Sequence, residues 1–147
     1  MKESDQQVIS LVRKFEKRLL TKNEWDHTSH LSVAIYYASA YGYGEALVRI
    51  RKNIKEFNES VGTPNSNSEG YHETITQFWL TTAFVFIEEE KFNSISQALS
   101  EFLQSPFSKR EYPLEFYSKE LLMSAEARHK WVKSDLKHFI PYDKLRT

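Results

Sequence analysis

Hydrophobic residues recur every three or four positions along most of the chain, the spacing that is typical of amphipathic helices. The first such stretch runs from Val8 to Leu19 behind Ser4 and Gln7, whose separation matches a capping box. A second stretch begins near Thr21, which forms another box of this kind with Glu24, and it continues to the glycines that follow residue 40. The pattern therefore predicts a helix at each of these two places.

The same spacing continues through the middle of the chain. A third helix is expected to end at Gly62, and the polar segment 63–70 is the one clear loop. The fourth helix, expected from Tyr71 to about Glu90, is hydrophobic on nearly all sides. Such a helix is usually central and covered by its neighbours.

Shorter helices are expected in the last third of the chain. They lie roughly over residues 94–103, in a stretch containing Pro113 that ends at Leu122, and over residues 125–132, and residues 135–147 are expected to form an irregular tail. No strand-like alternation and no repeat interrupts this pattern. We therefore expect an all-α fold of six or seven helices, packed as one domain over residues 1–147 in an orthogonal or bundle-like array.

Composition and charge narrow the function classes. Among 147 residues, 40% are hydrophobic and 14% aromatic, which is enough for a full core without disulfides, and the chain contains no cysteine. Twenty basic residues balance twenty acidic ones, so no excess of positive charge predicts binding to nucleic acid or to an anionic membrane. The first residues lack the hydrophobic core of a signal peptide, and the longest hydrophobic stretch is too short to span a bilayer. We expect a cytoplasmic protein.

Two short words rich in histidine point to a place for chemistry. His27 and His30 stand three residues apart in D-H-T-S-H-L, and His72 and Glu73 stand together in G-Y-H-E-T. Both words open predicted helices, and the positive end of a helix favours the neutral form of histidine. If the two helix starts lie side by side, these histidines form a metal site for Zn²⁺, Fe²⁺ or Ni²⁺, completed by a carboxylate.

The same convergence is also compatible with a site for a small polar ligand. In that case Tyr71, Glu73, Thr76 and Trp79 are the residues expected to bind it, and hydrolytic or proton-transfer chemistry fits such a set. No phosphate-binding glycine loop, serine nucleophile elbow or dinucleotide fingerprint is present. The residues leave open whether the protein is an enzyme.

A structural role for the histidines is the alternative hypothesis. Histidines in the first turn of a helix often bond main-chain groups, here those of the 63–70 loop, and Glu73 fits the third position of a capping box after Gly70. The protein would then be an interaction domain without catalysis. It would expose a hydrophobic patch at the predicted Trp131 helix or at the 102–107 edge, to serve a partner or a homodimer.

The two histidine words resemble the signature of a family of small, uncharacterised bacterial proteins, W-x-H-x-x-H-L followed by G-Y-H-E-T-[IL]-T. The likeness extends over most of the chain, including the C-terminal segment from Ser118 to Leu136, where Ser134 replaces the usual proline. No activity is attached to the family. The resemblance implies that the pocket residues to carry over are His27, His30, His72, Glu73 and Thr76.

Overall fold

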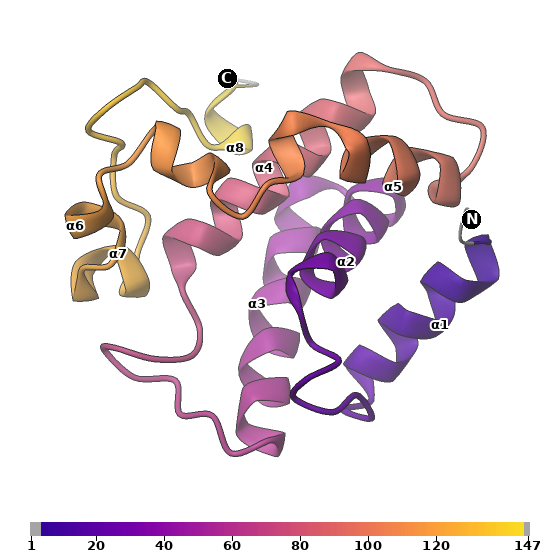
Figure 1. Ribbon diagram of the computed structural model, residues 1–147, viewed down its shortest axis with the longest axis horizontal. Helices are drawn as coiled ribbons and strands as arrows, with labels where there is room; N and C mark the ends of the chain where they lie inside the picture. Colours follow the sequence, from indigo (N-terminus) through magenta and orange to yellow (C-terminus); the bar gives the residue numbers. More distant parts are fainter. Residues whose placement is uncertain (1–3, 146–147) are drawn as a thin grey trace.

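The computed structural model describes residues 4–145, and within them the chain is helical, with no strands (Figure 1). Residues 1–3 and 146–147 lie outside the described part. The prediction of an all-α fold is confirmed. In chain order the elements are α1 (Asp5–Glu16), α2 (His27–Ala40), α3 (Tyr43–Ser60), α4 (Glu73–Glu89), α5 (Ile95–Gln104), the 3₁₀ turns η1 (Pro106–Ser108) and η2 (Tyr112–Glu115), α6 (Lys119–Leu122), α7 (Ala125–His129) and α8 (Tyr142–Leu145).

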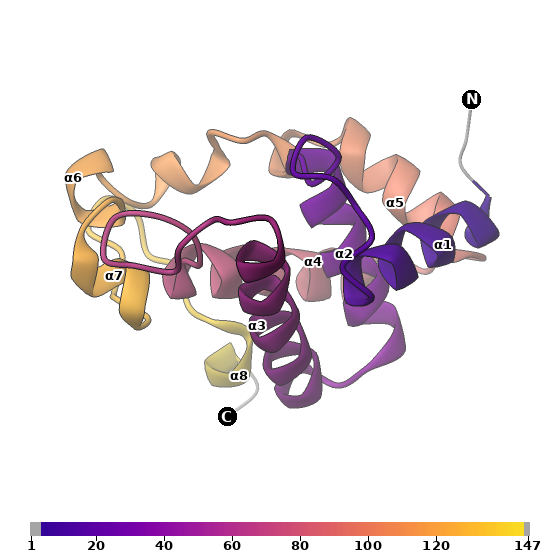
Figure 2. The ribbon, with the colours of Figure 1, turned by 90° about the horizontal axis from the view of Figure 1, so that it is seen from below.

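The main core surrounds α2 and α4. These two helices pack against each other more extensively than any other pair, while α1, α3 and α5 lie around them (Figures 1 and 2). Leu31, Val33 and Ile35 are all buried although they point to different sides of α2. This central position explains why α2 lacks a polar face. α4 has the covered position that its hydrophobic pattern predicted.

A second, smaller core holds the C-terminal third against the first half of α4. Phe78 at 0% exposure is its centre, and Tyr117 and Ala127 are equally buried. The hydroxyl of Tyr117 donates a hydrogen bond of 2.6 Å to the carbonyl of Val132, which closes the segment on itself. Trp79 packs against both cores. The short helices α6 and α7 are thereby fixed beside the start of α4.

Helix boundaries follow the local capping signals, with one correction. Ser4 and Gln7 form the expected capping box at the start of α1. Thr21 and Glu24 also exchange box-like hydrogen bonds, of 2.7 and 3.2 Å, but they close only a turn. The helix begins at His27 because the Asp26 side chain caps it by accepting the Ser29 amide, so the expected start near Thr21 was wrong.

The number of helices differs slightly from the expected six or seven. The described residues contain eight α-helices, since the single turn α8 was not expected as a helix, while α6 is the end of the expected stretch to Leu122. The predicted helix over 125–132 ends at His129, so Trp131 is not helical. The segment expected to be an irregular tail contains the turn α8 within its described part, and residues 146–147 of that tail are outside it.

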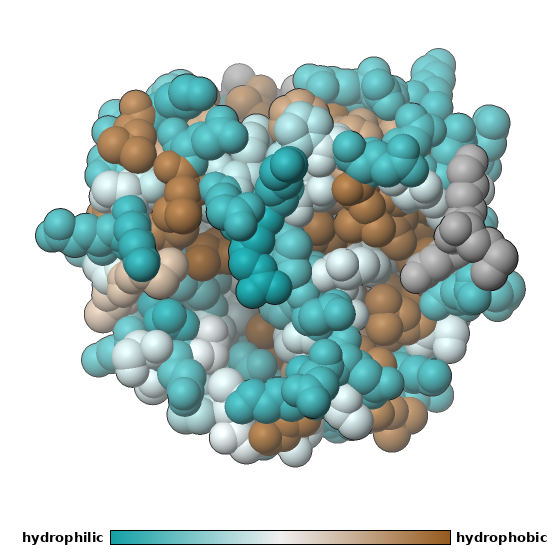
Figure 3. Space-filling model, viewed as in Figure 1, coloured by the Kyte–Doolittle hydropathy of each residue, from teal (hydrophilic) through white to brown (hydrophobic). Residues whose placement is uncertain are grey.

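Among the described residues no helix is long and hydrophobic enough to cross a membrane. Exposed large hydrophobic side chains are scattered over several elements. They include Leu19, Val48 and Leu136, each more than half exposed. On the face shown in Figure 3, hydrophobic residues lie in separate groups between hydrophilic ones. Leu103 and Phe107 are partly exposed at the 102–107 edge, at 36% and 40%.

Candidate ligand-binding site

A pocket of about 440 Å³ opens where the starts of α2 and α4 approach α3 and the α6–α7 segment. We call it the main pocket. Its volume lies within the range of small-molecule sites, roughly 300–1,000 Å³. The residues that line it are Lys22, Trp25, His30, Ala34, Ile50, Ile54, Phe57, Asn58, Val61, Thr63, Gly70, Tyr71, His72, Ile75, Thr76, Trp79, Met123 and Arg128.

His72 anchors the start of α4 to the C-terminal segment. Its Nδ1 accepts the amide of Ile75 at 3.1 Å, so the imidazole serves as the helix N-cap. Its Nε2 lies 2.6 Å from the carbonyl of Leu122 and must donate to it. Both ring nitrogens are therefore occupied and the ring is neutral. Burial lowers the pKa of His72, which is consistent with this neutral state.

The connector between α3 and α4 needs a glycine at its end. Gly70 has φ +82°, and a Cβ there would lie 2.2 Å from the carbonyl oxygen of Pro64. Any other residue would collide with the backbone. The side chain of Asn65 holds the turn from inside, because it accepts hydrogen bonds from the Tyr71 amide and from Asn58, both at 3.0 Å. Gly70 and Tyr71, the first two residues of G-Y-H-E-T, thus form part of the wall of the main pocket.

Arg128 closes this end of the main pocket from α7. Its Nη1 donates to the carbonyl of Gly70 at 3.0 Å and approaches that of Tyr71 at 3.5 Å. Its Nε is buried and donates to no described residue. No described carboxylate forms an ion pair with Arg128. A buried donor without a partner is a feature that requires an explanation, and Arg128 as a residue also lines the main pocket.

His30 is the histidine whose ring faces the pocket without a main-chain partner. It comes from the first turn of α2 and lies against Trp25, with 3.9 Å between ring centroids. Within residues 4–145 neither of its ring nitrogens forms a hydrogen bond. Burial lowers the pKa of His30 to about 4, with a smaller contribution from His27 in the same direction. The ring is neutral near pH 7 and can both donate and accept.

His27 lies outside the main pocket. Its Nε2 is 2.8 Å from the carbonyl of Ser108, in the turn η1, and its ring stands edge-on to Trp79. It lines an adjoining pocket of about 620 Å³ together with His30. His27 therefore ties the start of α2 to the turn after α5. The structural hypothesis expected main-chain partners in the 63–70 loop, and this was wrong, because the carbonyls that His27 and His72 bond belong to Ser108 and Leu122.

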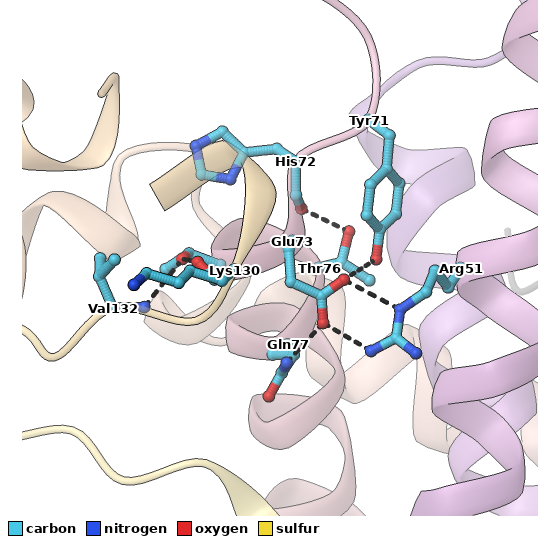
Figure 4. Close-up of polar contacts among 9 residues, drawn as sticks. Arg51, Tyr71, His72, Glu73, Thr76, Gln77, Lys130 and Val132 are labelled. Atoms are coloured by element: carbon cyan, nitrogen blue, oxygen red, sulfur yellow. Dashed lines mark hydrogen bonds and ion pairs between the residues drawn. The ribbon is translucent and has the colours of Figure 1, made fainter. Parts of the chain in front are cut away.

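Glu73 belongs to a buried polar network on the other side of Tyr71 (Figure 4). Arg51 of α3 binds its carboxylate through two hydrogen bonds, of 2.6 and 3.0 Å, while Tyr71 and Gln77 donate to it at 2.7 and 2.5 Å. Burial alone would raise the pKa of Glu73, but these three donors outweigh it and hold the pKa below its usual value. The Glu73 carboxylate and the His72 ring point in different directions in Figure 4.

The predicted site residues are thus divided among three neighbouring pockets. The main pocket is lined by His30, His72, Tyr71, Thr76 and Trp79. His27 lines only the adjoining pocket, and Glu73 lines a third pocket around its own network. Within residues 4–145 no group of three or more His, Asp or Glu side chains is arranged to hold a metal ion. The metal site stays a prediction, while the convergence of the two helix starts is a structural fact.

Most residues that line the main pocket were not predicted from the sequence, among them Trp25, Lys22 and Arg128. Trp25 is the first residue of the W-x-H-x-x-H-L signature, two residues before His27, so its position gave a signal. Arg128 gave none of its own, because it reaches the site through the packing of α7 on α4. Its carbonyl partner lies 58 residues away along the chain.

Comparison of the chain with protein-family models, with curated proteins and with solved structures gives no match. The resemblance to the bacterial family with the two histidine words therefore stays a prediction, and the functional interpretation depends on the pocket itself.

Proposed function

We propose that the protein binds a small organic anion with a hydrophobic or aromatic body in the main pocket. The observation that carries this proposal is Arg128, which lines the end of a largely hydrophobic pocket and forms no ion pair with a described carboxylate. A guanidinium presents several N–H donors in one plane, which match the two oxygens of a carboxylate. An anionic group in the pocket beside Arg128 would give this guanidinium the ion-pair partner that the described chain does not supply.

Charge supports an anion as the ligand. Lys22 and Arg128 line the main pocket, and none of its lining residues is an Asp or Glu. The chain as a whole has equal numbers of acidic and basic residues, so this local excess is not a consequence of overall composition. A concave surface with one sign of charge and low-dielectric walls concentrates ligands of the opposite sign.

The remaining walls support a ligand with a hydrophobic body. Trp25 and Trp79 line the pocket, and α3 contributes Ile50, Ile54 and Phe57. Burial of hydrophobic area contributes roughly 25 cal/mol per Å² to affinity before the costs of association are subtracted. A flat hydrophobic body would therefore supply attraction, while the charged end would fix the orientation.

His30 fits a binding role better than a catalytic one. Its neutral ring can donate one hydrogen bond and accept another from the ligand. A group with a pKa of about 4 is a weak base at neutral pH, whereas an efficient general base has a pKa near the working pH. Metal binding by His27, His30 and His72 has less support, because two of these rings already bond carbonyl oxygens.

The proposal is tested with 2-naphthoate, an aromatic monocarboxylate, by isothermal titration calorimetry. We expect saturable 1:1 binding to the full chain, weakened about tenfold or more in Arg128→Met and less in Arg128→Lys, which keeps the charge but not the planar fork. Arg13→Met is the matched control, because Arg13 is an exposed arginine of α1 outside the pocket. Wild-type affinity in a folded Arg128→Met variant, or no binding to the unaltered protein, would overturn the proposal.

A further inference from the structure

A separate pocket of about 380 Å³ lies beside the second half of α4. We call it the α4 pocket. It is lined by α4, by the 3₁₀ turns η1 and η2, and by residues 138–140 and Leu145 of the C-terminal segment, which lies beside α4 in Figure 1. It shares no lining residue with the main pocket, and its volume is also within the range of small-molecule sites.

The C-terminal segment forms the cover of the α4 pocket because it is attached to both cores. Phe139 packs into the smaller core, and Tyr142 packs against the main core. The amide of Tyr142 also donates a hydrogen bond of 2.9 Å to the hydroxyl of Thr81 on α4. Ile140 lies between these two attachments and lines the pocket. The cover is therefore fixed at both ends, and the pocket is formed before any ligand binds.

Most residues that line the α4 pocket are hydrophobic, and four of them are aromatic. Phe86 comes from α4, Phe107 from η1, Tyr112 from η2 and Phe139 from the C-terminal segment. The rings of Phe107 and Tyr112 contact each other, with 5.5 Å between their centroids, but no other pair of these four rings is in contact. Surfaces of this kind bind hydrophobic groups, and aromatic rings also attract cations.

The charge at the α4 pocket is negative. Glu89 is the one acidic residue among its described lining residues, and none of them is a Lys or Arg. The side chain of Glu89 is exposed, which places its carboxylate at the mouth of the pocket, and it forms no ion pair within residues 4–145. Since α4 ends at Glu89, the negative end of the helix dipole lies at the same mouth. Both features favour a cation there.

We propose that the α4 pocket binds a small organic cation with a hydrophobic body. The cationic group lies at Glu89, and the body lies in the space lined by Phe86, Phe107, Tyr112 and Phe139. The ligand therefore has the opposite charge to the anion proposed for the main pocket. This inference does not rest on the proposed function, because the two pockets have no lining residue in common.

The test compares 4-phenylbutylamine, a cation at pH 8, with 4-phenylbutanol, which has the same hydrophobic body and no charge. In isothermal titration calorimetry at pH 8 we expect saturable 1:1 binding of the amine, about fivefold tighter or more than that of the alcohol, because a charge pair at an exposed site has an effect of this order. In Glu89→Gln this preference should disappear, while the affinity for the alcohol stays the same. Glu90→Gln is the matched control, because it removes the next carboxylate, which is exposed and outside the pocket.

A second pair of variants locates the hydrophobic body. Phe107→Ala should weaken the binding of both compounds severalfold, because the Phe107 ring lines the pocket at 40% exposure. Leu103→Ala should leave both affinities unchanged, since Leu103 has a similar exposure of 36% on the same edge but lies outside the pocket. Circular dichroism checks that each variant is folded.

Several results would overturn this inference. The amine could fail to bind, or bind no tighter than the alcohol. Glu90→Gln could remove the preference as fully as Glu89→Gln, which would mean that the general charge at the end of α4 causes it. Leu103→Ala could weaken binding as much as Phe107→Ala. Displacement of the amine by 2-naphthoate would place the amine in the main pocket. None of these results bears on the binding of 2-naphthoate itself, so the proposed function is tested separately.

Discussion

Replacement of His72 by alanine tests how much this side chain stabilises the fold where α4 begins. The imidazole makes two buried hydrogen bonds, one as the N-cap of α4 and one to the carbonyl of Leu122. Loss of an N-cap costs about 0.5–2 kcal/mol, and a buried carbonyl left without a donor costs about 1–3 kcal/mol. We therefore expect His72→Ala to lower the free energy of unfolding by roughly 2–4 kcal/mol.

The two contributions can be separated by a second variant. His72→Asn retains a side-chain acceptor that is favoured at N-caps, but it is too short to reach the carbonyl of Leu122. It should recover about 1 kcal/mol of the loss that His72→Ala causes. Urea unfolding followed by circular dichroism gives both values, provided that the slope of each transition is unchanged. A His72→Ala protein within about 0.5 kcal/mol of the unaltered chain would refute this role of the ring.

Three further outcomes are expected. The free energy of unfolding should fall by roughly 2 kcal/mol between about pH 7 and about pH 5, because the pKa of His30 is near its ordinary value of 6.5 in the unfolded chain but about 4 in the folded protein. Urea titrations of His30→Gln should show a smaller fall. Glu73→Gln should lower the free energy of unfolding by about 1–3 kcal/mol, and a double-mutant cycle with Arg51→Met should give a coupling energy near 1 kcal/mol. Additive effects of the two substitutions would mean that the ion pair between Arg51 and Glu73 is not formed. In thermal unfolding, Gly70→Ala should lower stability by about 2 kcal/mol or more, since a Cβ would lie 2.2 Å from a backbone oxygen. Gly44→Ala within α3 should instead raise stability by about 0.5–1 kcal/mol. Equal effects of the two substitutions would contradict the conformation of the connector between α3 and α4.

The direction of this pH effect follows from the lowered pKa. A base whose pKa is lower in the folded state binds fewer protons there than in the unfolded state, so stability rises with pH in the interval between the two pKa values. For His30 that interval runs from about 4 to 6.5. Glu73 adds to the loss at lower pH, because its carboxylate has a lowered pKa and its stabilising effect disappears once it is protonated.

Local signals explain how much of the fold the sequence could predict. The hydrophobic spacing located α1 to α5, and the Ser4 and Gln7 box set the first boundary. The Thr21 and Glu24 box misled because the same two hydrogen bonds also close an isolated turn. The start of α4 was placed at Tyr71, two residues early, because histidine is an unusual N-cap and its bond to the Ile75 amide was not expected from the sequence.

The candidate site was predictable where residues on one helix share a face. His72, Thr76 and Trp79 follow helical spacing at the start of α4, and all three line the main pocket. Glu73 is offset from them by about 100° around the helix axis, which turns its carboxylate towards Arg51 of α3. That partner and Arg128 depend on how distant segments pack, and no local pattern shows which of the twenty basic residues will arrive there.

The binding of an anion at Arg128 can be observed on the guanidinium that carries the proposal. In protein labelled with ¹⁵N, the Nε–H resonance of Arg128 reports on hydrogen bonding at that donor. We expect it to shift progressively and saturate as 2-naphthoate is added, together with the amides of the 70–72 segment, while the amides of α5 stay in place. Saturable binding of 2-naphthoate with an unmoved Arg128 Nε–H resonance would show that the anion is held elsewhere.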